Sequence, residues 1–426
     1  TVMVKLTPSR FNYTQAKPDG SDIRFVDQDN ALLSYEIEKW DNTGDSFIWV
    51  RVPKIDANSN TDYIYLYYNN PNAVSAENAS DVWQDYYAVW HMTEVNITDS
   101  TSNEYNGTAN SGVSFNPSGK IDGADNFNGN GYIAINNFPD LQSNFTIEAL
   151  IYTNNNAKAG QRIFCDDESN TGGYALSLGD PGTGALRFYS RNMDTISLDT
   201  ATGVIANNQW YYVAGVADRT NEDRLIYVNG EIKASDLTDT GIWGTDAGTA
   251  SVGGETDLGE TLNRFDGILD EVRISKLVRT TAWINASYYN VMDEFIIFAG
   301  EETATPPIID NVVIVPVNPL DNQNLNCSFT VTDQDSNEIL YANITWYRNN
   351  EHITDYDVYN LNVSAQGTFY TNITVPSNVT MPSDNWTCSV LVWDKNELMT
   401  YKNGSAIILD SHSWWNASWL YRKGIY

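Results

Sequence analysis

The chain has 426 residues, of which 42% are hydrophobic and only 19% charged, so two to four domains can each bury a core. Acidic residues outnumber basic ones 55 to 24, and the resulting net charge of −31 argues against binding to nucleic acids or anionic membranes. The same balance favours cations, Ca²⁺ above all, and no apolar run is long enough to form a membrane span.

Short β-branched and aromatic runs, bounded by Gly, Asn, Asp and Pro, recur along the chain and predict an all-β protein. Residues 46–52, 62–68 and 145–152 are typical examples. Residues 224–233 predict a hairpin, because Asn229-Gly230 supplies the two positive φ angles of a type I′ turn. One short helix is expected near residues 281–289.

Changes in composition predict the domain organisation. A stiff linker is expected at residues 300–307, which contain two prolines, and a softer boundary near residues 82–87. We therefore expect four parts: a split β-sandwich domain, a jelly roll, a linker with a second sandwich, and a terminal strand, covering residues 1–84, 85–302, 303–410 and 411–426.

Motifs in the first part resemble an uncharacterised extracellular β-domain family often found before LamG-like domains. They are Asp-Ile-Arg-Phe at 22–25, Tyr-Glu-Ile-Glu at 35–38 and Tyr-Leu-Tyr-Tyr at 65–68. This family normally begins with Trp-x-Tyr-Arg-Lys, which here stands at Trp419–Lys423. The family has no established activity, so the resemblance implies a fold and not a reaction.

The second part resembles a LamG-like, concanavalin A-like jelly roll. The family's motifs occur in order at residues 89–92, 119–124, 145–148, 209–214, 226–230 and 265–274. The resemblance implies a structural Ca²⁺ site formed by Asp99, Asn103, the backbone of Gly123 and Asp270, with a hydrogen-bonded turn as the alternative. The segment 333–337 has alternating oxygens too, but is more typical of a plain loop between strands.

The third part resembles an immunoglobulin-like sandwich, because Cys327, Trp346 and Cys388 have the spacing of that family. A disulfide between Cys327 and Cys388 fits an exported protein, and Cys165 is expected to be a small buried residue.

Asn-X-Ser/Thr sequons indicate an extracellular protein, since their number is roughly twice what residue frequencies alone would give. Eight of the fourteen lie after residue 320. The predicted glycosylation sites are Asn12, Asn78, Asn96, Asn106, Asn144, Asn285, Asn326, Asn343, Asn362, Asn372, Asn378, Asn385, Asn403 and Asn416.

Catalysis is not expected. A glycosidase needs two converging carboxylates, but Asp270 and Glu271 are adjacent in a predicted strand and should point to opposite faces. Glu36 and Glu38 share a face but belong to the first domain's own motif. His91, in an apolar strand, is expected to be a core residue with satisfied hydrogen bonds.

Two functional hypotheses follow. In the first, the chain is an exported, glycosylated subunit of an archaeal-type surface filament, sheath or S-layer, and the terminal strand of one copy completes the split domain of the next copy. The anchors would be Trp414, Trp415, Trp419 and Tyr421, with Arg422 and Lys423 as the polar tip. Alternatively, the strand folds back onto its own chain. In the second hypothesis, the protein is an adhesin whose LamG-like domain binds glycans.

Overall fold

The computed structural model describes residues 1–56, 61–167, 172–191, 193, 195–241, 249–256, 263–301, 305–335, 339–364, 366–394 and 398–411. The protein is nearly all β, as predicted, and divides into two compact units, Thr1–Phe298 and Ala299–Tyr426. The first two predicted parts thus pack into one unit, while their exact boundaries stay predictions.

The N-terminal sandwich consists of two three-stranded sheets with the orders β1-β5-β4 and β3-β2-β6. Its elements are β1 (Val2–Leu6), η1 (Tyr13–Gln15), β2 (Arg24–Asp27), β3 (Leu32–Leu33), β4 (Tyr35–Lys39), β5 (Ser46–Val50) and β6 (Ile64–Tyr67). Every residue of β5 is buried, because both faces of this strand are covered. Ile48 and Val50 face the sandwich's own core, whereas Phe47 and Trp49 contribute to a second core shared with the jelly roll.

The jelly roll consists of an eight-stranded and a seven-stranded sheet. The larger sheet has the order β19-β18-β17-β12-β21-β10-β9, with β7 also paired to β21; the smaller has the order β16-β15-β14-β13-β20-β11-β8. The strands are β7 (Tyr86–Trp90), β8 (Gly107–Ala109), β9 (Val113–Asn116), β10 (Ala124–Asn128), β11 (Ile133–Ile135), β12 (Phe145–Thr153), β13 (Gln161–Asp166), β14 (Tyr174–Leu178), β15 (Leu186–Ser190), β16 (Ser197–Asp199), β17 (Trp210–Asp218), β18 (Asp223–Val228), β19 (Glu231–Asp236), β20 (Ala250–Val252) and β21 (Asp266–Ser275).

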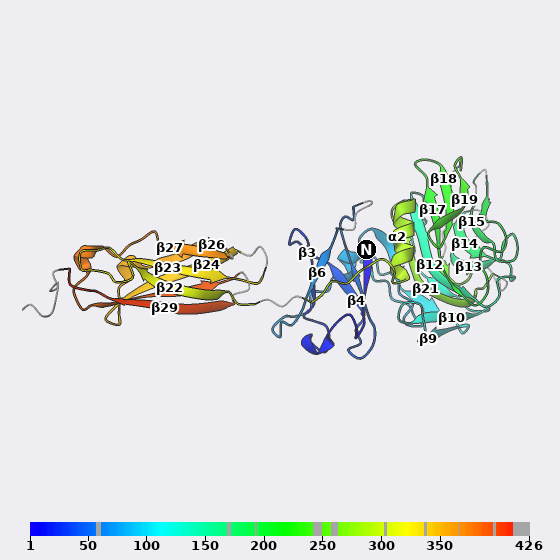
Figure 1. The fold of residues 1–426 in the computed structure, drawn as a ribbon. Helices are drawn as coiled ribbons and strands as arrows, with labels where there is room; N and C mark the ends of the chain where they lie inside the picture. The colour runs from blue at the N-terminus through cyan, green and yellow to red at the C-terminus, as the bar shows by residue number, and fades with distance from the viewer. Residues whose placement is uncertain are drawn as a thin grey trace, which may run out of the picture. The chain divides into compact units, whose positions relative to one another are not determined.

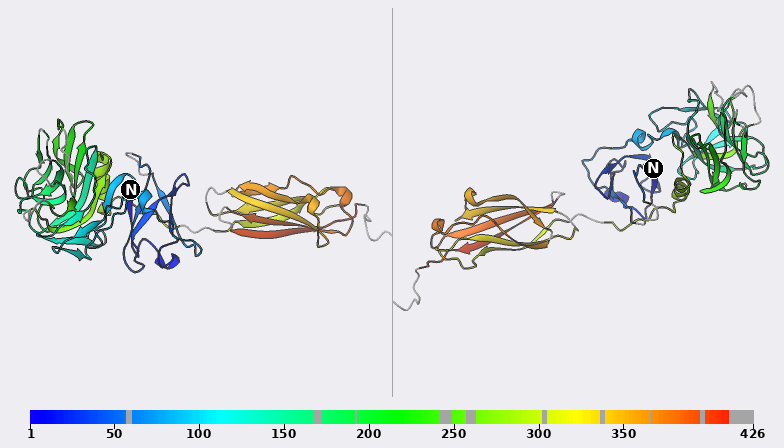
Figure 2. Two further views of the ribbon diagram at one scale, coloured as in Figure 1. Left: turned by 180° about the vertical axis from the view of Figure 1, so that it is seen from behind. Right: turned by 90° about the horizontal axis from the view of Figure 1, so that it is seen from above.

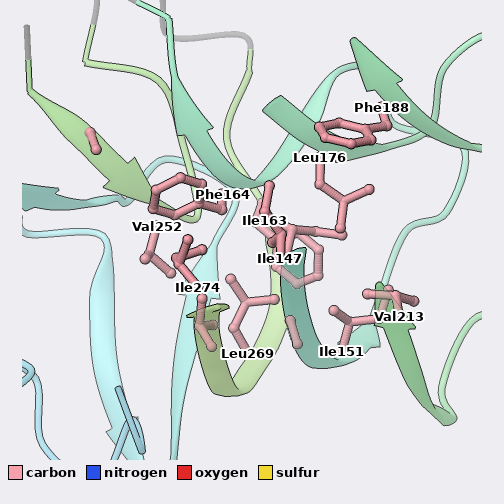
Figure 3. Close-up of a cluster of buried hydrophobic side chains, with 14 of the residues drawn as sticks. Ile147, Ile151, Ile163, Phe164, Leu176, Phe188, Val213, Val252, Leu269 and Ile274 are labelled. Atoms are coloured by element: carbon pink, nitrogen blue, oxygen red, sulfur yellow. The ribbon is translucent and has the colours of Figure 1, made fainter. Parts of the chain in front are cut away.

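The largest hydrophobic core of the described residues lies between these two sheets, which belong to the part drawn in cyan and green in Figures 1 and 2. In Figure 3, Leu176 and Phe188 of the smaller sheet point toward Ile147, Ile151 and Leu269 of the larger one. The predicted hairpin is confirmed: Asn229 and Gly230 have φ angles of 50° and 80° between β18 and β19.

Helix α2 (Thr281–Val291) confirms the predicted helix and packs on the outer face of the eight-stranded sheet. It also contacts β1, which lies beside it in Figures 1 and 2. The Asn290 side chain accepts a hydrogen bond from the Met3 N–H at 2.7 Å and donates one to the Met3 carbonyl at 3.0 Å. The helix therefore occupies the outer edge of β1 at Met3. The shorter helix α1 (Ala79–Val82) connects the two domains. Neither α-helix of the described residues has the length and apolar character that a membrane span requires.

The second unit is also a sandwich, with sheet orders β22-β23-β27 and β25-β24-β28-β29, and with β26 paired to β24. Its elements are β22 (Ile308–Val315), β23 (Asn326–Thr332), β24 (Ile339–Arg348), β25 (Glu351–His352), η2 (Thr354–Tyr356), β26 (Val358–Ser364), β27 (Gln366–Tyr370), η3 (Ser377–Val379), β28 (Asn385–Trp393) and β29 (Met399–Ile407). A disulfide joins Cys327 and Cys388 across the two sheets, and Trp346 is buried in the same core. The immunoglobulin-like assignment stays a prediction.

Candidate functional site

A cluster of charged side chains is buried where the N-terminal sandwich meets the jelly roll. Its first members come from β4. Successive side chains of this strand point to opposite faces, so Tyr35 lies in the sandwich core while Glu36 and Glu38 face the jelly roll. The indole N–H of Trp49 donates to Glu38 Oε2 at 2.7 Å, and the Ser100 hydroxyl donates to Glu36 Oε1 at 2.7 Å. The Trp83 indole also donates to Glu36. Both carboxylates are therefore held in fixed positions.

His91 directly follows β7, and it occupies the centre of the cluster. Its Nδ1 atom lies 2.8 Å from Glu271 Oε1 and 3.4 Å from Glu38 Oε2. Its Nε2 atom lies 3.3 Å from Glu36 Oε2. The expectation that His91 is buried and satisfied is confirmed, but its partners are carboxylates of two domains rather than the surroundings of an apolar core.

A β-bulge in β21 positions the other carboxylates. Between Asp270 and Arg273 the register with β12 shifts by one residue, and Glu271 has a φ of 50°. The strict alternation we expected for Asp270 and Glu271 is therefore wrong: Leu269 and Val272 both pack in the core between the sheets, which leaves the two carboxylates between them on the same, opposite face. The Arg273 guanidinium donates to Glu271, with Nε 3.0 Å from Oε2.

Burial and neighbouring charges together set the protonation of the cluster. Burial raises the pKa of Glu38 well above its ordinary value, and the charge of Glu271 adds to this. Burial alone would also raise the pKa of Glu271, but His91 and Arg273 outweigh it and hold the pKa at about 2. For His91, burial acts to lower the pKa, yet Glu271, Glu38 and Glu36 raise it well above the usual range. The cluster is thus a network of strongly interacting charges.

The residues predicted to bind Ca²⁺ have hydrogen-bond partners from the protein. Asp99 accepts from the N–H groups of Val89, Thr101 and Tyr105 and from the Thr101 hydroxyl. Asp270 accepts from the N–H groups of Lys120 and Ile121, next to the buried Gly123. The Asn103 amide donates to the Tyr87 carbonyl. The contacts of Asp99 with Thr101 and Tyr105 have the form of the hydrogen-bonded turn given as the alternative, and the Ca²⁺ site stays a prediction.

Elsewhere in the described chain, a small pocket of about 150 Å³ lies beside β1 and α2, lined by Lys5, Lys120, Asp293 and apolar side chains. Most ligand pockets are larger. Cys165 is buried, as expected.

The predicted sites on the surface fall into two groups. Every sequon asparagine in the described residues is exposed or half-buried, which leaves each accessible at least in part. Asn416 and the predicted interface residues Trp414, Trp415, Trp419, Tyr421, Arg422 and Lys423 lie outside the described residues.

Comparisons with known families cover the two domains that form the cluster. Residues 127–285 match the family model of the concanavalin A-like lectin/glucanases superfamily. The middle of this chain is a concanavalin A-like domain. Residues 19–103 match a domain of unknown function, DUF2341, so Glu36, Glu38 and His91 lie in one family segment and Glu271 in the other. No curated protein matches the chain at a significant level.

Solved structures that resemble the chain are distant in sequence. Domain 4 of AbnA, a GH43 extracellular arabinanase from Geobacillus stearothermophilus in complex with arabinotriose, is 21% identical over 47% of this chain and 97% of that one, with a TM-score of 0.39. The CBM40 of a Ruminococcus gnavus IT-sialidase bound to α2,3-sialyllactose is 18% identical over 34% and 83%, with a TM-score of 0.31. A pentraxin from Limulus polyphemus is 18% identical over 35% and 71%, with a TM-score of 0.29.

The sequence alone does not bring together Glu36, Glu38, His91 and Glu271. Their contacts link positions up to 180 residues apart, and no local pattern reports such a pairing. For His91 and Glu271 the one available signal was a polar residue in a largely apolar segment, because buried charges require partners.

Proposed function

We propose that this chain is an exported, non-catalytic structural protein of the cell surface, a subunit of a filament, sheath or S-layer. One observation carries the proposal: the cluster's carboxylates and imidazole are buried between two domains, with side chains of Glu38 and Glu271 only 2% exposed. Groups enclosed in this way can hold two domains together but cannot reach a polymeric substrate. The N-terminal sandwich and the concanavalin A-like domain therefore form one compact unit.

Export is supported by two features of the described residues. A disulfide joins Cys327 and Cys388, and disulfides persist in oxidising compartments outside the cytosol. The sequon asparagines among the described residues are exposed or half-buried, and those of the second unit lie on several strands and loops of the sandwich. A glycosylated coat would suit a protein that stays at the surface.

We further propose that copies assemble head-to-tail, with residues 414–426 of one copy pairing with an edge strand of the next copy. Strand β6 is at the edge of its sheet and carries the exposed Tyr65 and Tyr67, and the exposed Tyr63 directly precedes it; the consecutive ring centroids are 5.2 and 6.1 Å apart. The edge of β1, by contrast, is occupied at Met3 by Asn290. An aromatic segment would find complementary apolar surface at β6.

Deletion of residues 412–426 tests this assembly. We expect the truncated chain to remain folded but monomeric in light scattering, whereas the full chain forms particles visible by electron microscopy. Tyr65→Lys, which places a charge on the edge strand, should also reduce assembly. Particles of unchanged yield from the truncated chain would rule out strand donation, while a folded monomer of the full chain under all conditions would rule out the structural role.

A second candidate function is carbohydrate binding by the concanavalin A-like domain. On the outer face of its seven-stranded sheet, the half-buried Arg187 of β15 and the half-buried Arg191 lie on either side of Tyr189 in sequence, which is itself buried. Arginine side chains can bind sugars through hydrogen bonds. A glycan array distinguishes the candidates: selective binding by the monomeric chain that is lost in Arg187→Ala would favour the adhesin.

A further inference from the structure

We propose that Glu38, His91 and Glu271 form a binding site for a divalent transition-metal ion, with Zn²⁺ as the best match, between the N-terminal sandwich and the concanavalin A-like domain. In this site His91 binds through Nδ1 and the two glutamates through carboxylate oxygens. The ion is structural and joins the domains. The proposal does not depend on how copies of the chain assemble.

The distances between donor atoms suit a small cation. One donor atom from each of the three residues lies within 4.8 Å of the other two. His91 Nδ1 is 2.8 Å from Glu271 Oε1 and 3.4 Å from Glu38 Oε2. Ligands bound to Zn²⁺ at about 2.0–2.1 Å in tetrahedral geometry are about 3.3 Å apart, so small side-chain shifts would complete the site. One imidazole with two carboxylates is a donor set that Zn²⁺ accepts.

A buried oxygen without a partner points to a missing ligand. The Glu38 side chain is only 2% exposed, so its Oε1 atom is shielded from water. This atom also has no hydrogen-bond partner among the described residues. Such an atom is costly to bury. The other oxygen, Oε2, already accepts from Trp49 and lies near His91, so a cation bound by both oxygens of this carboxylate would supply the partner that Oε1 lacks.

The charge balance of the cluster also suits a divalent ion. In the form that binds a metal ion, His91 is neutral and Glu36, Glu38 and Glu271 are ionised, so these three carboxylates and the one guanidinium of Arg273 carry a net charge of −2. Asp270 lies nearby but accepts two backbone N–H groups. A divalent cation would neutralise the remaining charge, which is large for a buried site.

Each proposed ligand has a second partner that fixes its orientation. His91 Nε2 lies 3.3 Å from Glu36 Oε2, the arrangement in which a metal-bound histidine donates its other N–H to a carboxylate. Trp49 donates to Glu38 at 2.7 Å, and Arg273 donates to Glu271 at 3.0 Å. Trp83 and Ser100 in turn hold Glu36. The three protein ligands are thus preorganised, and the fourth position of a tetrahedral ion would be filled by a water molecule or by a second carboxylate oxygen.

The competing interpretation is a protonated His91 that bridges the carboxylates without a metal ion. The full chain, purified without chelators, would be examined by elemental analysis and by thermal unfolding with added Zn²⁺ or chelator. We expect one Zn²⁺ per chain, a midpoint of unfolding that falls on chelation and recovers with Zn²⁺, and loss of the metal in Glu38→Gln and His91→Gln. His352→Gln serves as the control, because His352 pairs with Asp357 in the other unit.

Because the variants could fail to fold, Co²⁺ substitution of the unmodified chain provides a second measurement. Intense visible absorption of tetrahedral Co²⁺, displaced by Zn²⁺, is the expected result. A chain that binds neither ion and whose unfolding midpoint is indifferent to Zn²⁺ and chelator would overturn the proposal. Retention of the metal in both folded variants would overturn it as well, since the ion would then lie elsewhere.

Discussion

The guanidinium of Arg273, on strand β21, lies 4.1 Å from the centre of the Trp49 ring, on strand β5 of the N-terminal sandwich. The same arginine donates to Glu271, whose other oxygen contacts His91. One side chain therefore joins the aromatic surface of one domain to the charged cluster of the other. Arginine suits this position because its planar cation can stack on an indole and still donate hydrogen bonds in its own plane.

Arg273→Met should destabilise the first unit, Thr1–Phe298, by about 3–5 kcal/mol, because it leaves the Glu271 carboxylate buried without the guanidinium that pairs with it. The change would be measured by urea unfolding of the full chain, followed by tryptophan fluorescence. Arg187→Met is the matched control: it removes a pair with Asp199 that is about one quarter exposed on both sides, and should cost less than about 1 kcal/mol. Equal effects of the two substitutions would show that the buried pair has no special role.

Gly253→Ala should be more damaging than Gly203→Ala, although both glycines have positive φ angles, of 74° and 81°. The left-handed conformation costs an alanine about 1–2 kcal/mol at either position. At Gly253 the added methyl group would also stand 2.1 Å from the Phe127 ring in the core, whereas nothing lies within 4 Å at Gly203. Overpacking adds about 1–3 kcal/mol. Thermal unfolding of the two variants tests this difference, and similar midpoints would contradict it.

Removal of the disulfide by Cys327→Ala with Cys388→Ala should destabilise the second unit by about 4 kcal/mol, since the bridge closes a loop of 61 residues. Calorimetry should then show a lower transition for that unit and an unchanged one for the unit containing residues 1–298. Cys165→Ala is the control, because Cys165 lies in the first unit and forms no disulfide. A shift of both transitions would mean that the two units unfold together.

Asp125→Asn should stabilise the protein increasingly as the pH rises from 4 to 8. Asp125 is fully buried, neither of its carboxylate oxygens has a hydrogen-bond partner in the described residues, and burial raises its pKa to about 8. This folded-state pKa exceeds the unfolded value near 3.8. The contribution of Asp125 to the stability of the parent chain is therefore fully present below pH 4 and is lost as the pH approaches 8. The expected slope is on the order of 1 kcal/mol per pH unit. Parallel pH profiles of the variant and the parent chain would refute this assignment.

Local patterns were sufficient for most of the secondary structure. The period-2 runs gave the strands, and Asn229-Gly230 gave the hairpin, because these signals depend only on neighbours along the chain. The all-β class followed from the same runs, and the order of the motifs indicated a concanavalin A-like domain in the middle of the chain. Composition alone does not report that the first two parts pack as one unit, since it does not reveal which apolar faces meet.

The charged cluster was decided only by the tertiary structure. The alternation of side chains along a strand correctly placed Glu36 and Glu38 on one face. The same rule wrongly separated Asp270 from Glu271, because a strand-like sequence does not reveal the bulge or the positive φ angle at Glu271. His91 meets Glu36 and Glu271 across 55 and 180 residues of chain. A sequence determines by itself what each residue can do within its own strand. Which charges share one buried volume depends on how whole sheets pack, and that is settled by the burial of apolar surface from both domains together.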